Sequence, residues 1–193
     1  MIYCVLIPID KSISFTFRQA IGLHFANMAV LLAFPILSIL LILQSAIISR
    51  VPLVQGTADL ILLALIAWSI HKRVKTAWHW GVIGGLMVSF VSAMPFGVPL
   101  VGYLLAVGLT LILRRRVWQA PILAMFVATF LGTLVIHLLD LIALRLVGNP
   151  LSWLDAVNQI TLPSILLNLL LAIPAYAILG DLANWLHPEQ LEM

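Results

Sequence analysis

Long apolar stretches alternate with short polar segments along the chain, and this alternation is the main structural signal. Six stretches carry almost no charge, and a bilayer-spanning helix needs about 20 mostly apolar residues. We therefore predict an all-α membrane protein, a compact bundle of six transmembrane helices. The second, third and fourth stretches are short, so they must borrow flanking residues or sit inside the bundle. The expected spans are Asn27–Ile48, Ala58–Ile70, Trp80–Ala93, Pro99–Leu113, Pro121–Leu144 and Leu162–Leu186.

These spans divide the chain into three parts. Residues 1–26 are an N-terminal tail, 27–187 the transmembrane domain and 188–193 a C-terminal tail. Apolar residues recur every fourth position within 12–26, which fits an amphipathic helix on the membrane surface. A disordered or extended entry to the first span fits this tail equally well.

The composition excludes a separate soluble domain. Of the 193 residues, 63% are hydrophobic and 9% are charged, against about 45–50% and about 25% in soluble proteins. Six spans leave only short turns and tails, which have no room for an ATPase or an external catalytic module. The net charge of +3 does not indicate a nucleic-acid partner, because the basic residues lie at helix ends, as the positive-inside rule predicts.

Two basic turns set the expected orientation. Six of the ten Lys and Arg residues lie within Lys72–Lys75 and Arg114–Arg116. Short loops rich in Lys and Arg stay in the cytoplasm. An even number of spans then places both termini in the cytoplasm. The acidic residues Asp59, Asp140 and Asp155 fall on the opposite side.

Small residues form a stripe along the third span. Ala77, Gly81, Gly85, Ser89 and Ala93 recur at every fourth position, so they share one helical face. Small faces let membrane helices approach closely. We expect the third and fourth spans to form a tight hairpin at the centre of the bundle.

Few polar groups occur within the spans. His137 and Asp140 are three residues apart and share a face, and Asp59 and Asn168 lie in the outer halves of their spans. Most of these groups are expected near a water boundary, in a structural or interface role, with no polar cluster at the midplane. The lone Cys4 and the scattered histidines form no metal motif, and no catalytic motif is present. The sequence thus predicts that the protein binds no cofactor or metal and is not an enzyme.

Several segments, taken in order, resemble MreD, the rod shape-determining membrane protein family of bacteria, over about residues 30–187. Two positions depart from the family pattern, since Ser89 stands where an acidic residue is frequent and Ala58 where proline is usual. The segments that carry the resemblance are Ala58–Leu63, Gly81–Leu86, Pro95–Gly97, Gly102–Leu104, Arg114–Arg116 and the stretch Pro163-Ser164-x-x-x-Asn168-x-x-x-x-x-Pro174-x-Tyr176.

The resemblance implies a non-catalytic scaffold of the cell-elongation complex in the bacterial inner membrane, organising side-wall peptidoglycan synthesis. The implied partners are MreC, the glycosyltransferase RodA, a class B penicillin-binding protein, the cytoskeletal MreB and membrane lipids. The implied fold is similar to the S components of energy-coupling-factor transporters. The residues expected to bind a partner or to pack helices are Asp59, Gly81, Gly85, Ser89, Asn168, Pro174 and Tyr176.

Two other functions compete with the scaffold. The shared fold allows a substrate-binding membrane subunit of an energy-coupling-factor vitamin transporter. That function requires a polar cavity open to the outside, which Asp59, His137, Asp140 and Asn168 could line. An intramembrane enzyme would require a polar cluster at the midplane.

Overall fold

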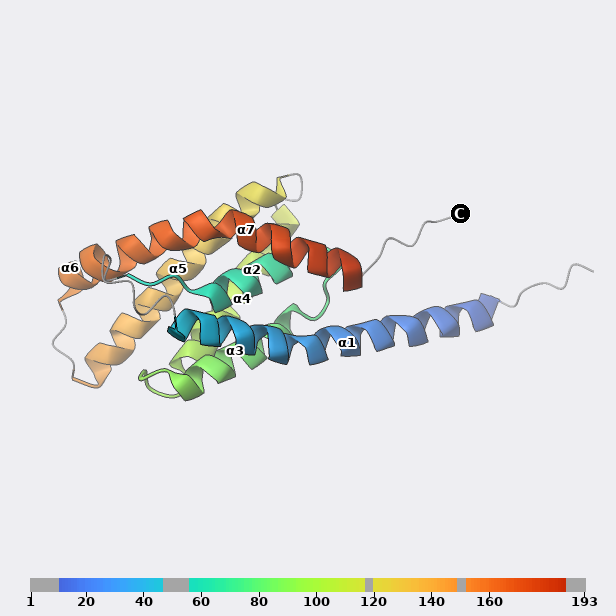
Figure 1. The fold of residues 1–193 in the computed structure, drawn as a ribbon, viewed down its shortest axis with the longest axis horizontal. Helices are drawn as coiled ribbons and strands as arrows, with labels where there is room; N and C mark the ends of the chain where they lie inside the picture. The colour runs from blue at the N-terminus through green and yellow to red at the C-terminus, as the bar shows by residue number, and fades with distance from the viewer. Residues whose placement is uncertain (1–10, 47–55, 117–119, 149–151, 187–193) are drawn as a thin grey trace, which may run out of the picture.

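The computed structural model describes residues 11–46, 56–116, 120–148 and 152–186, and these ranges are helical apart from short turns. Figure 1 shows an elongated bundle in which α1 extends well beyond the other helices. The elements are α1 (Lys11–Ala46), α2 (Leu60–Ile70), α3 (Ala77–Val91), α4 (Val98–Arg116), α5 (Pro121–Leu146), α6 (Trp153–Asp155), the π-helix η2 (Ala156–Thr161) and α7 (Leu162–Leu186).

Four helical segments are long and apolar enough to cross a membrane: Met28–Ala46, Val98–Arg116, Pro121–Leu146 and Trp153–Leu186. The chain is therefore a multi-pass helical membrane protein, as the apolar pattern predicts. The expectation that the fourth span is short was wrong, because α4 has 19 residues and its last turn includes all three arginines of Arg114–Arg116. α2 and α3 are shorter, with 11 and 15 residues.

The centre of the bundle is α2. Every residue from Ile61 to Ile70 is buried, and α2 contacts α1, α3, α4, α5 and α7 (Figure 1). The prediction that the hairpin of the third and fourth spans lies at the centre was wrong, since Phe90 of α3 and Ile112 of α4 are exposed. A helix that is apolar on all sides is buried on all sides, and α2 is the one that fits this description.

The hairpin of α3 and α4 is nevertheless tightly packed. A Cβ atom added at Gly85 would lie 2.8 Å from the Cα of Leu100, so only glycine allows this approach of the two backbones. Gly81 faces the side chain of Val107, and Ser89 is buried and donates a hydrogen bond to the Gly85 carbonyl. The stripe ends before Ala93, which lies in the turn beyond α3 and is exposed.

The turn between α3 and α4 depends on one glycine. Gly97 has a φ of +91°, in the left-handed region that L side chains rarely adopt. The Val98 amide donates to the Pro95 carbonyl and the Val101 amide to the Gly97 carbonyl, so the turn leads directly into α4. This closure joins the end of α3 to the start of α4.

α1 runs without a break from Lys11 to Ala46, across the expected boundary between the tail and the first span. Its contacts are with α2 and α3. Ala29 is buried, and its carbonyl accepts a 3.0 Å hydrogen bond from the Trp80 indole nitrogen. The Trp80 ring in turn stacks on Trp68 of α2, with ring centroids 4.3 Å apart, so aromatic contacts join the three helices.

Helical structure begins earlier before the last span than we expected. Most of the segment 145–161, which separates the last two expected spans, is helical, because α6 and η2 lead directly into α7. No glycine or proline interrupts residues 153–162, so the helix can begin early. In a regular α-helix the ring of Pro163 would clash with the carbonyl four residues back, and the wider turns of the π-helix η2 lie directly before this proline. The backbone of Gly56 packs against this segment, where an added Cβ would lie 2.6 Å from the Ser164 nitrogen.

The two ends of the bundle differ in charge. At one end, called the basic end below, Lys72, Arg73 and Arg114 surround a single cavity. At the other, called the acidic end, Asp59 and Asp140 line another. The two basic turns and these two acidic residues thus lie apart along the bundle, and the side of the membrane that each faces stays a prediction.

Candidate functional site

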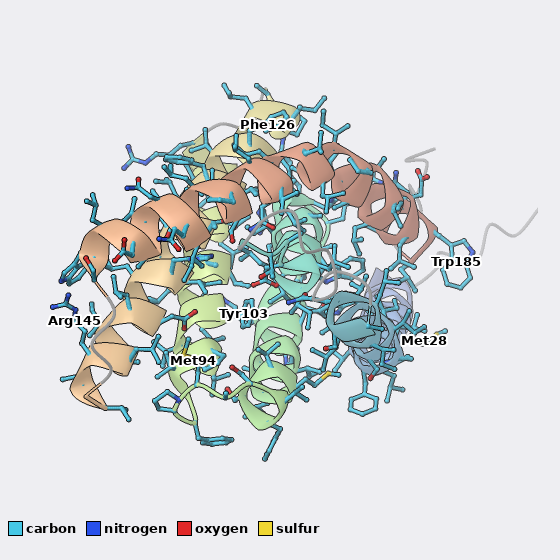
Figure 2. All side chains as sticks on the ribbon, turned by 60° about the vertical axis from the view of Figure 1, so that its left-hand side comes forward. Met28, Met94, Tyr103, Phe126, Arg145 and Trp185 are labelled. Atoms are coloured by element: carbon cyan, nitrogen blue, oxygen red, sulfur yellow. The ribbon has the colours of Figure 1, made fainter. Side chains whose placement is uncertain are left out.

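The most polar region inside the bundle surrounds the start of α2. Asp59 is the N-cap residue, and its Oδ1 accepts a 2.9 Å hydrogen bond from the Leu62 amide. Its Oδ2 accepts a 2.7 Å hydrogen bond from the hydroxyl of Tyr103 in α4. Figure 2 shows Tyr103 in the interior of the bundle, whereas Met28 and Trp185 lie at its periphery. One carboxylate therefore caps α2 and ties it to α4.

Asn168 of α7 binds the same helix start from the other side. Its Oδ1 accepts a 2.7 Å hydrogen bond from the Asp59 amide, and its Nδ2 donates to the Thr133 hydroxyl at 3.0 Å. Thr133 then donates to the Thr129 carbonyl within α5. Asn168 and Thr133 are both buried. Both ends of the Asn168 amide thus make hydrogen bonds that join α7 to α2 and α5.

Two further side chains complete this set. Gln44 of α1 accepts a hydrogen bond from the Leu60 amide at 2.9 Å, and Ser164 of α7 accepts one from the Thr57 amide at 3.0 Å. The first amides of any helix lack partners within the helix, and a membrane offers no water to replace them. We call Gln44, Asp59, Tyr103, Thr133, Ser164 and Asn168 the α2 network.

α2 is much shorter than a bilayer is thick. With 11 residues and a rise of about 1.5 Å per residue, α2 is about 16 Å long. The hydrocarbon core of a bilayer is about 30 Å thick, so α2 covers about half of it. That Asp59 lies near the outer face and that no polar cluster forms at the midplane stay predictions.

A cavity of about 300 Å³ extends from this network toward the acidic end. Asp59 and Tyr103 contribute to its wall, together with His137 and Asp140 one turn apart on α5. The expected shared face of His137 and Asp140 is confirmed, since both side chains line this cavity. Within the described residues, no group of three or more His, Cys, Asp or Glu could hold a metal ion.

A second hollow lies on the side of the bundle, between α1 and α3. It has a volume of about 390 Å³ and is almost wholly apolar. Its wall is made by Val30 of α1 and by Trp78, His79, Val82 and Ile83 of α3. We call it the α1–α3 groove.

The residues that we expected to bind a partner or to pack helices lie in three different regions of the structure. Asp59 and Asn168 meet in the α2 network. Gly81, Gly85 and Ser89 are buried in α3, as described above. Pro174 is exposed on α7, and Tyr176 lines the cavity at the basic end, with its ring 5.2 Å from that of His71.

Sequence reasoning did not assign a role to Gln44, Tyr103, Thr133 or Ser164. One signal was available, because Asp59 and Tyr103 each lie about three helical turns before a basic turn and so reach a similar depth. Gln44 and Thr133 carried no such marker, since single polar residues are common in membrane helices.

No protein-family model, curated protein or solved structure matches the chain.

Proposed function

We propose that this protein is a non-catalytic membrane scaffold of the MreD type, acting in the elongation complex of a bacterial inner membrane. One observation carries the proposal. Residues from three separate segments that resemble the family, Asp59, Tyr103 and the pair Ser164 and Asn168, converge on the α2 network. Segments that define one shared fold are expected to meet in this way.

The internal use of these polar groups also supports a scaffold over an enzyme. Asp59, Asn168 and Ser164 each accept a hydrogen bond from the backbone around the start of α2. Asp59 and Asn168 also bond to the hydroxyls of Tyr103 and Thr133. A catalytic carboxylate or amide must keep an atom available for substrate. The network therefore stabilises a helix start in the membrane rather than presenting reactive groups.

The proposed topology has six crossings with both termini in the cytoplasm. α2 and α3 provide two of the crossings although they are short, because neighbouring helices surround α2 on all sides. The turns at Lys72–Lys75 and Arg114–Arg116 face the cytoplasm by the positive-inside rule. The acidic end then faces outward.

The α1–α3 groove is the proposed docking surface for the single transmembrane helix of MreC. It opens on the side of the bundle and offers apolar walls from two helices. An apolar helix in lipid gains little from hydrophobicity and binds where packing is close, and a groove provides that packing. RodA, the penicillin-binding protein and MreB would then associate directly or through MreC.

Site-directed photo-crosslinking tests the groove. A benzoylphenylalanine at Val82, which is 39% exposed in the groove, should crosslink to co-expressed MreC. The matched control is Leu166, an exposed apolar residue on α7. Crosslinks from the Leu166 position alone would place the partner elsewhere. If MreC fails to co-purify in detergent while both proteins are folded, the scaffold function itself is wrong.

The acidic-end cavity favours one alternative, the substrate-binding subunit of an energy-coupling-factor vitamin transporter. About 300 Å³ with a histidine and two carboxyl groups in its wall is at the small end of ligand sites, which span about 300–1,000 Å³. Mass spectrometry of extracts from the denatured, purified protein discriminates the two functions. A stoichiometric vitamin in the extract would favour the transporter, and an empty extract the scaffold.

A further inference from the structure

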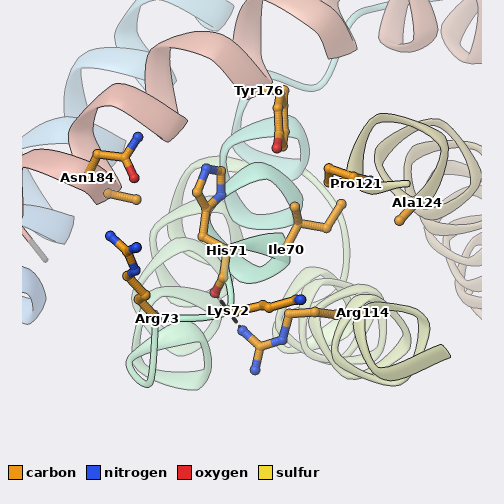
Figure 3. Close-up of a pocket in the computed structure, with 10 residues that line it drawn as sticks. Ile70, His71, Lys72, Arg73, Arg114, Pro121, Ala124, Tyr176 and Asn184 are labelled. Atoms are coloured by element: carbon orange, nitrogen blue, oxygen red, sulfur yellow. Dashed lines mark hydrogen bonds between the residues drawn. The ribbon is translucent and has the colours of Figure 1, made fainter. Parts of the chain in front are cut away.

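The cavity at the basic end has a concentration of positive charge. Its volume is about 300 Å³, and it lies between the ends of α2, α4, α5 and α7. Lys72, Arg73 and Arg114 contribute to its wall, with Tyr176 and Asn184 from α7 opposite them (Figure 3). None of the described acidic residues lines it. Three cations, a phenol and an amide therefore line one cavity.

Arg114 is held in place by the backbone beneath the cavity. Its Nη1 donates to the carbonyls of Ser69 at 2.9 Å, His71 at 2.7 Å and Val74 at 3.3 Å. A cation at the C-terminal end of a helix also compensates the negative end of the α2 dipole. The charge of Arg114 is thus part of the fold and is fixed before any ligand arrives.

His71 adds no charge to this cavity at neutral pH. Burial lowers the pKa of the His71 imidazole below its ordinary value, and the positive charge of Arg114 lowers it further, against the opposing effect of the hydrogen bond to the Ala67 carbonyl. In the neutral ring Nδ1 carries the proton, because it lies 2.8 Å from that carbonyl. The attraction for anions thus comes from Lys72, Arg73 and Arg114.

The helices α5 and α7, which border the cavity, also carry exposed apolar side chains. Pro121 and Ala124 of α5 line it, while Ile122 and Leu123 between them are each 56% exposed. On α7, Tyr176 lines the cavity, and Ile178 two residues later is 67% exposed. Because both helices belong to membrane-crossing segments, these exposed side chains face acyl chains.

We propose that this cavity binds the phosphate headgroup of an anionic phospholipid. Basic pockets between membrane helices bind such headgroups, and guanidinium groups form strong, charge-assisted bonds to phosphate. The volume suits a headgroup without its acyl chains. The acyl chains would lie along exposed apolar side chains of α5 and α7, which a free phosphate ion would not use.

Native mass spectrometry tests this site. The full-length protein is purified in mixed micelles with equal phosphatidylglycerol and phosphatidylcholine, and the retained lipids are counted. The variant Lys72→Gln/Arg73→Gln removes two cations of the cavity. The matched control Lys75→Gln/Arg115→Gln removes one charge from each of the two basic turns, at exposed residues outside the cavity.

Wild-type protein should retain phosphatidylglycerol in preference to phosphatidylcholine. The cavity variant should retain at least about tenfold less, the change expected from losing one charge-assisted hydrogen bond, and the control should change by less than about twofold. An equal loss of bound phosphatidylglycerol in both variants would mean that the lipid is held by general electrostatic attraction, and it would overturn the proposed binding site. Inorganic phosphate at millimolar concentration should leave the lipid bound; full displacement by it would make this a site for the free ion.

A variant that fails to fold is replaced by Tyr176→Phe, which removes only one hydroxyl from the cavity wall. It should reduce phosphatidylglycerol retention several-fold, and unchanged retention would overturn the contact with the headgroup. Thermal unfolding monitored by tryptophan fluorescence establishes that each variant is folded before its lipids are counted.

Discussion

Substitution of Asn168 by alanine is the most direct test of the α2 network. The change removes the acceptor of the Asp59 amide and the donor to the Thr133 hydroxyl. Thr133 keeps its own hydrogen bond to the Thr129 carbonyl. Asn168 is the acceptor that the structure gives to the Asp59 amide, so the loss of this acceptor dominates the effect.

The size of the effect follows from these two losses. A buried donor left without a partner costs about 1–3 kcal/mol, and hydrogen bonds between membrane helices contribute about 0.6 kcal/mol on average, with a maximum of about 1.7 kcal/mol. We expect a destabilisation of about 2 kcal/mol. For a chain of 193 residues, each kcal/mol lowers the melting temperature by about 2–4 °C, so the total decrease should be about 4–8 °C.

Thermal unfolding in detergent micelles measures this decrease, with fluorescence of the stacked pair Trp68 and Trp80 as the signal. The matched control is Asn184→Ala, an asparagine on the same helix that is exposed. It should change the melting temperature by less than about 2 °C, because surface substitutions stay within about 0.5 kcal/mol. Equal decreases for the two alanine variants would refute the structural role of the network.

Three further measurements follow from the structure. Gly85→Ala places a methyl group 2.8 Å from the Leu100 backbone and should destabilise the folded protein by about 1–3 kcal/mol. In the control Gly108→Ala the added methyl group meets only the far end of a tryptophan ring, so its cost should be much smaller. Equal melting temperatures of the two variants would contradict the close approach of α3 and α4. Tyr103→Phe removes one hydrogen bond to the Asp59 carboxylate and should cost about 1 kcal/mol, measured in the same assay. Burial lowers the pKa of His71 from its ordinary value of 6.5, so the unfolded chain takes up a proton before the folded one as the pH falls. Stability should therefore decrease as the pH falls through 6.5, and a His71→Asn variant should lose part of this dependence.

The apolar pattern predicted the helices well because each spanning segment must satisfy its own backbone in lipid. The hairpin of α3 and α4 followed from the stripe at Gly81 and Gly85 for the same local reason, since small residues at one helical spacing can serve one close contact. Helical periodicity and composition thus carried these parts of the fold.

The α2 network could be predicted only in part, because it depends on contacts between distant segments. Asp59 and Asn168 were recognisable as polar residues in apolar surroundings, but the hydrogen bond between them joins positions 109 residues apart. The partners of Asp59 belong to other helices, Tyr103 to α4 and Asn168 to α7, so no local pattern in the sequence marks them.

The short, fully enclosed α2 has a consequence for the order in which the chain enters the membrane. An 11-residue helix is too short to be released into lipid alone, where about 20 residues are needed. The backbone that leads into α2 is held by Ser164 and Asn168, which accept from the Thr57 and Asp59 amides and are synthesised more than 100 residues later. Insertion of α2 must therefore wait for the arrival of α7, and a chain truncated before Ser164 should leave the Asp59 segment at the membrane surface, open to proteases or to labelling.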